Sequence, residues 1–101
     1  MPEGAVVIRS ADPELQLQGL RTALSLALGD RPASVYLAGA GRAVLAAADD
    51  SEAGRCLVAL QEARIPVLAE GGAGDPAGHA EAVTLAEILA QTTAASFQQT
   101  F

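Results

Sequence analysis

A glycine turn is the first feature whose residue types suggest chemistry. Residues 34–47, "SVYLAGAGRAVLAA", begin as an apolar strand, break at Gly-Ala-Gly and resume in a helical pattern. Gly39 and Gly41 match the first two glycines of the dinucleotide-binding fingerprint, but Val44 takes the third position, where a β-branched side chain blocks close helix–strand packing. We therefore expect Gly39 and Gly41 to form a structural corner. The alternative is a small anion pocket, made by the amides around Gly41 and the Arg42 guanidinium.

Cys56 is the candidate nucleophile of the sequence. It lies in "EAGRCLVAL", where helical spacing places it on one face with other apolar side chains, namely Ala53, Leu57, Leu60 and Ala63. Burial in such a face disfavours the thiolate by desolvation, so we expect Cys56 to be structural. The alternative is a sulfurtransferase that uses the Cys56 thiol.

No other residue pattern indicates a catalytic or metal site. His79 is the one histidine, and it lies in the glycine-rich segment 71–79 with no second His or Cys at metal-ligand spacing. We expect a solvated loop histidine and no metal. Ser10 has no convergent Ser-His-Asp pattern and is expected in a turn. The sequence thus predicts no catalytic residue and no cofactor, and it favours a protein that is not an enzyme.

Among the carboxylates, Glu70 has the most suggestive position. It ends a predicted strand, where open α/β sheets place their ligand crevice. It could accept hydrogen bonds from a ligand or a neighbouring subunit, and the simpler alternative is an exposed loop carboxylate. Asp49 and Asp50 are expected to cap a helix, since an anion is favourable at a helix start. The candidate ligand-binding residues are therefore Gly39, Gly41, Arg42 and Glu70.

Strands alternate with helices along the chain. We expect strands over residues 5–10, 34–39 and 65–70, a further short strand over 80–83, and a half-exposed final strand with Phe97, Gln99 and Phe101 on one face. Segment 71–79 is predicted to be a mobile loop. This alternation implies βαβ crossovers. We predict one α/β domain over residues 1–101, a three-layer, mostly parallel sheet of four to five strands with helices on both faces.

Capping signals mark the helices. Asp12 and Pro13 begin the first, whose apolar stripe is ended by Gly29 and consists of Leu17, Leu20, Leu24, Ala27 and Leu28. A short helix is expected over 42–48. Asp49 and Glu52 form a capping-box pattern for a helix over 51–64, and Thr84 and Glu87 form another for a helix from 85 to about 92.

Composition restricts the possible partners. The 101 residues carry a net charge of −6, and the six basic residues, all arginine, are scattered, so nucleic acid is not expected as a partner. No run is long and apolar enough for a membrane span, and the N-terminus lacks the pattern of a signal peptide, so we expect a cytoplasmic protein. Half of the residues are hydrophobic but only 3% are aromatic. Such a thin core favours further burial against another subunit.

Several stretches together resemble the DsrE/DsrF/DsrH-like family, which includes the Tus sulfur-relay subunits. The resemblance covers nearly the whole chain and is carried by "VVIRS", "LQGLRTALSLAL", "SVYLAGAGRAVL", "LQEARIPVLAE", "AVTLAEIL" and "SFQQTF". It implies a compact parallel α/β sheet and assembly into homo- or hetero-oligomers. In active members it also implies a cysteine that carries persulfide sulfur just after the third strand.

The sequence departs from this family pattern where the chemistry lies. The expected cysteine position falls near residues 69–71, where Glu70 stands. A carboxylate cannot carry sulfane sulfur, so the resemblance implies a member without the usual active cysteine, similar to the DsrH/TusB kind that holds assemblies together. We expect a non-catalytic, oligomer-forming domain, with intracellular sulfur relay as its candidate context. The alternatives are a small-molecule or anion binder using Arg42 and Glu70, and the Cys56 sulfurtransferase.

Overall fold

In the part of the chain that the structure describes, five strands form one sheet in which all neighbouring strands are parallel. The computed structural model of the chain describes residues 4–48, 50–71 and 80–101. In the order β4-β3-β2-β1-β5, the sheet contains β1 (Gly4–Ile8), β2 (Ala33–Leu37), β3 (Val67–Glu70), β4 (Glu81–Val83) and β5 (Phe97–Thr100). The predicted fold class is confirmed, and the short strand near residue 82 and the final strand are both present.

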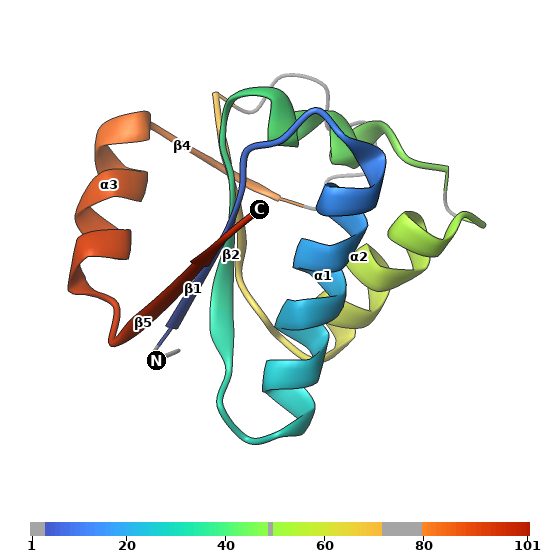
Figure 1. The fold of residues 1–101 in the computed structure, drawn as a ribbon, viewed down its shortest axis with the longest axis horizontal. Coiled ribbons are helices and arrows are strands. Elements are labelled where there is room, and N and C mark those ends of the chain that lie inside the picture. Colours follow the sequence, from blue (N-terminus) through green and yellow to red (C-terminus); the bar gives the residue numbers. More distant parts are fainter. Residues whose placement is uncertain (1–3, 49, 72–79) are drawn as a thin grey trace.

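Helices cover both faces of this sheet (Figure 1). On one face lie α1 (Pro13–Leu28) and α2 (Glu52–Glu62), and on the other lies α3 (Leu85–Ala94). The short helix expected after the glycine turn is η1 (Gly39–Ala46), a 3-10 helix that directly follows β2. The three predicted layers are therefore α1 and α2, the sheet, and α3.

Alternation along the strands divides the core into two clusters. Val6 and Ile8 of β1 belong to the larger cluster, with Leu20 of α1 and Leu57 of α2. Residues at the intervening strand positions face α3 and pack around Ile88 in the smaller cluster: Ala5, Val7, Tyr36 and Leu68. Because successive strand side chains point to opposite faces, the apolar runs "AVVI" and "SVYL" supply both clusters.

The helix starts follow the capping signals, with one correction. Asp12 accepts a hydrogen bond from the Glu14 amide at the start of α1, and Thr84 accepts one from the Glu87 amide at the start of α3. At α2 the cap is Ser51, whose hydroxyl accepts the Gly54 amide, and not Asp50, which is exposed. The hydroxyl reaches that amide in the usual N-cap geometry. Asp49 lies outside the described residues.

Several predicted boundaries shift by one to three residues. β1 ends at Ile8 because the chain then turns, and the Ser10 hydroxyl accepts the Asp12 amide in that turn, as expected for Ser10. β3 begins at Val67, after Pro66, which has no N–H for the ladder. α2 ends at Glu62.

The end of α1 differs from the predicted stripe. Leu28 is 89% exposed, so it does not belong to the buried face. Gly29 is the C-cap with φ −84°, and the left-handed residue is the next one, Asp30, at φ 63°. The turn is closed by the Arg31 amide, which donates to the Leu26 carbonyl. The glycine thus ends the helix without using its conformational freedom.

The final strand, β5, is hydrogen-bonded to β1, and the face with Phe97 and Phe101 packs against the core. The Phe101 amide donates to the Val7 carbonyl at 2.7 Å, and its carbonyl accepts the Arg9 amide. Phe97 and Phe101 pack against the larger cluster, and the Arg31 guanidinium lies 4.7 Å from the centre of the Phe97 ring. Much of the aromatic surface of β5 is therefore used inside the chain.

Within the described ranges, no helix is long and apolar enough to cross a membrane.

Candidate functional site

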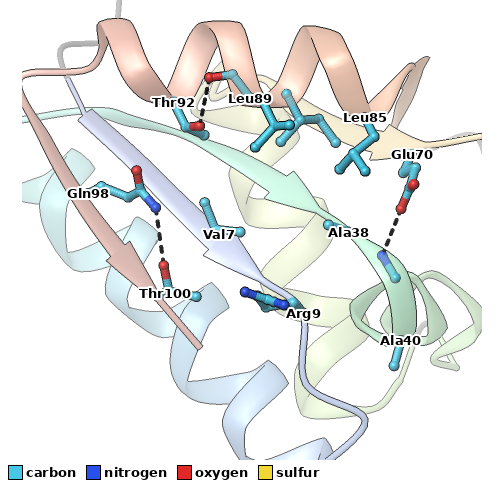
Figure 2. A pocket seen from close by; sticks show the side chains of 12 residues that line it. Val7, Arg9, Ala38, Ala40, Glu70, Leu85, Leu89, Thr92, Gln98 and Thr100 are labelled. Atoms are coloured by element: carbon cyan, nitrogen blue, oxygen red, sulfur yellow. Dashed lines mark hydrogen bonds between the residues drawn. The ribbon is translucent and has the colours of Figure 1, made fainter.

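A groove of about 530 Å³ opens between α3 and the carboxyl ends of the strands, and we call it the α3 groove (Figure 2). Val7 and Ala38 lie on its sheet side, and Leu85, Ile88 and Leu89 line it from α3. The chain from 38 to 40 is Ala-Gly-Ala, and such small side chains leave space beneath the helix. In parallel α/β sheets, ligands bind at this edge.

Glu70 lies at one end of the α3 groove. It is the last residue of β3 and is half-buried. Its Oε1 accepts a hydrogen bond of 2.9 Å from the Gly39 amide, the first N–H of η1, as the dashed line in Figure 2 shows. Gly39 has φ +54°, a conformation that suits glycine. The carboxylate thus closes the turn after β2 and is not a free loop carboxylate.

Arg42 joins the same turn from outside the groove. Its Nε donates to the Gly39 carbonyl at 3.0 Å, and its Nη1 donates to the Glu70 carbonyl at 3.2 Å. It is not among the residues that line the groove. The guanidinium therefore links η1 to the end of β3 through two backbone carbonyls.

Gly41 has a steric role. A Cβ at this position would overlap the carbonyl oxygen of Ile8, because η1 passes directly over the end of β1. Its amide donates to the Ala38 carbonyl at 3.0 Å. The structure thus brings the four predicted site residues together, but the amides of Gly39 and Gly41 and the Arg42 guanidinium bond to other groups of the chain.

Arg9 lines the groove and is not among the site residues predicted from the sequence. It follows β1, is exposed, and no described residue forms a hydrogen bond or ion pair with its guanidinium. The signal that could have found it is its place just after a central parallel strand, the same argument that selected Glu70. Gln98 and Thr100 of β5 line the groove beside β1.

Cys56 does not line the α3 groove. It belongs to α2 and is buried in the larger cluster, whereas the α3 groove is on the opposite face of the sheet. Desolvation by burial raises the pKa of the Cys56 thiol, and the nearby Glu52 carboxylate also raises it, while Arg21 and Arg55 act in the other direction. The expected burial of Cys56 is confirmed.

The remaining candidates give no site. His79 and most of the loop predicted over 71–79 lie outside the described residues. In the described ranges, no three His, Cys, Asp or Glu side chains are grouped so that they could hold a metal ion.

Comparisons with known proteins show the fold. No protein-family profile matches the chain, and no curated protein sequence matches it. The crystal structure of the ychN protein from E. coli is similar, with a TM-score of 0.71 and 19% sequence identity, over 98% of this chain and 99% of that chain. The two chains therefore share one fold along nearly their whole lengths.

Proposed function

We propose that this chain is a non-catalytic, oligomer-forming domain of the DsrE/DsrF/DsrH-like kind, with intracellular sulfur relay as its context. The observation that carries the proposal is the position of Glu70. It stands where the family resemblance places the persulfide-carrying cysteine, at the end of β3, and its carboxylate is hydrogen-bonded to the Gly39 amide. A carboxylate in this place stabilises the turn and cannot accept sulfane sulfur.

The position of Cys56 supports a non-catalytic role. To replace the missing cysteine, its thiol would have to reach the α3 groove, but it is buried in the cluster on the other face of the sheet. Burial also raises its pKa, and the thiolate is the form that attacks sulfur. A sulfurtransferase that uses Cys56 is therefore the least favoured of the three candidate functions.

Exposed apolar side chains support the assembly part of the proposal. Leu28 is 89% exposed, and Leu89 and Leu85 of α3 are 58% and 48% exposed. Phe97 and Phe101 are less available than the sequence pattern indicated, since they pack against the larger cluster. We propose contacts with further copies of this chain or with related subunits through α3 and the end of α1.

Sulfur loading tests the non-catalytic claim. We expect wild-type protein incubated with a low-molecular-weight persulfide donor to gain no sulfur by mass spectrometry. Glu70→Cys, which places a thiol at the groove, serves as the positive control and should gain one sulfur atom. A sulfur adduct on Cys56 of the folded wild-type protein would overturn the proposal and favour a sulfurtransferase.

A second candidate function is the binding of a small molecule, and the α3 groove favours it. Its volume of about 530 Å³ and its largely apolar lining are typical of small-molecule sites. The polar groups of this groove differ from those of the anion pocket expected at Arg42, because Arg42 bonds to the Gly39 and Glu70 carbonyls. A ligand in the groove would meet Arg9 and Glu70 instead.

A further inference from the structure

We propose that the α3 groove binds a small monocarboxylate with an apolar body, and that the Arg9 guanidinium holds the carboxylate. This inference rests on the second candidate function, small-molecule binding, and adds the ligand class and the residue that selects it. It is independent of the proposed lack of sulfur chemistry.

The apolar body is indicated by the walls of the groove. Val7 and Ala38 lie on the sheet side, and Leu85 and Leu89 of α3 line the groove although they are 48% and 58% exposed. Figure 2 shows both leucines directed from α3 toward the sheet. A ligand between them and the sheet would remove their apolar surface from water, which favours binding roughly in proportion to the area covered.

The carboxylate is indicated by Arg9. Its guanidinium lines the groove, and no described residue pairs with it. Guanidinium groups bind carboxylates through two parallel N–H···O bonds, which are charge-assisted. Gln98 and Thr100, on the strand next to β1, supply further polar groups at this end. The chain as a whole carries a charge of −6, so an arginine that no described residue pairs with gives an anion a local place to bind.

Glu70 limits the ligand to one carboxylate. It lines the groove from β3, and β2 lies between β3 and β1 in the sheet. Two strand spacings separate the two ends by roughly 10 Å. A second carboxylate that extends from Arg9 across the groove would approach the Glu70 carboxylate, which already accepts the Gly39 amide. Like charges repel, so the groove should reject dicarboxylates.

Three six-carbon probes test the ligand class. Hexanoate, neutral hexanamide and hexanedioate are titrated into labelled protein, and amide shifts are followed by NMR. We expect hexanoate to shift amides around residues 38–40 and in α3 with saturation. Hexanamide should bind about tenfold more weakly because the charge-assisted pair is lost, and hexanedioate about tenfold more weakly because Glu70 repels its second carboxylate. Equal binding of hexanamide would overturn the role of charge and leave small-molecule binding standing. If no probe shifts these amides, both the inference and the second candidate function are wrong.

Matched variants test whether Arg9 binds the carboxylate. Arg9→Gln should weaken hexanoate binding about tenfold and leave hexanamide binding unchanged. Arg64→Gln is the control. Arg64 is also exposed, but it precedes β3 and so lies at the amino end of that strand, whereas the groove lies at the carboxyl ends. Leu89→Ala, at a position that is 58% exposed, should weaken the binding of both probes because apolar groove surface is lost. Unchanged hexanoate binding in Arg9→Gln would contradict the proposal, whatever the other variants show.

Discussion

At Gly41 the 3-10 helix η1 crosses the end of β1 so closely that a side chain would overlap the Ile8 carbonyl oxygen. We expect Gly41→Ala to destabilise the fold by about 3 kcal/mol, because the obstacle is backbone and cannot turn aside. Gly39→Ala is the matched control. Its Cβ would meet no atom within 4 Å, and its φ of +54° costs about 1 kcal/mol. Urea unfolding measures both, and an equal or smaller loss for Gly41→Ala would refute the steric role.

Cys56 provides a test of burial at the level of a single thiol. We expect a thiol reagent to label it at least about tenfold more slowly in the native protein than in denaturant, since the thiolate is disfavoured and the side chain is buried. Rapid labelling of the native protein, detected by mass spectrometry, would contradict the burial of Cys56 in the larger cluster.

The raised pKa of Cys56 also predicts a pH dependence. In the unfolded chain the thiol ionises near its ordinary value of 9.0, whereas in the folded protein it ionises at higher pH. The folded state therefore binds the proton more tightly, and stability falls as pH rises above 9.0. Cys56→Ala should lack this part of the decline. Urea unfolding of both proteins at several alkaline pH values compares the slopes, and identical slopes would show that the folded-state pKa is not raised.

At the scale of elements, α1 and α2 are each followed by a residue that adopts the left-handed backbone conformation although it is not glycine. These residues are Asp30 and Arg64. Arg64 follows α2 at φ 60°, and the Ile65 amide next to it donates to the Leu60 carbonyl. Arg64→Gly should stabilise the protein by about 0.5–1 kcal/mol, because the Cβ strain is removed while the turn is kept. Ala59→Gly, inside the same helix, should destabilise the protein by about 1 kcal/mol. Thermal unfolding tests the pair, and a loss of stability in Arg64→Gly would contradict the assignment.

Local signals in the sequence predicted most elements correctly. Asp12 with Pro13, and Thr84 with Glu87, marked helix starts that the structure confirms, because capping depends on neighbours within one turn. The predicted N-cap of α2 was wrong because Asp49, Asp50 and Ser51 are all suitable N-cap residues. Only the backbone path selects Ser51. The exposure of Leu28 likewise depends on where α1 stops.

The candidate site was harder to predict because its roles depend on contacts between distant parts of the chain. The sequence indicated a structural corner at Gly39 and Gly41, but not that Glu70 accepts the Gly39 amide across 31 positions. The place of Arg9 just after a predicted strand was the one sequence signal for it, and that signal does not reveal the groove, which exists only once α3 packs on the sheet.

At the scale of the whole molecule, the sheet separates two environments. One face carries α1, α2 and the buried thiol, and the other carries α3 and the groove with Arg9 and Glu70. Among the described residues, those that line the groove at the strand ends include no cysteine. This separation is the physical reason for proposing a non-catalytic domain.

Native mass spectrometry after incubation with a persulfide donor tests the central claim most directly, because one spectrum reports both assembly and sulfur loading. Across micromolar concentrations, we expect a closed assembly whose mass is a whole multiple of the chain mass, with no added sulfur. A single-chain mass throughout would contradict self-assembly. A mass increment of one sulfur per chain on Cys56 would contradict the non-catalytic role.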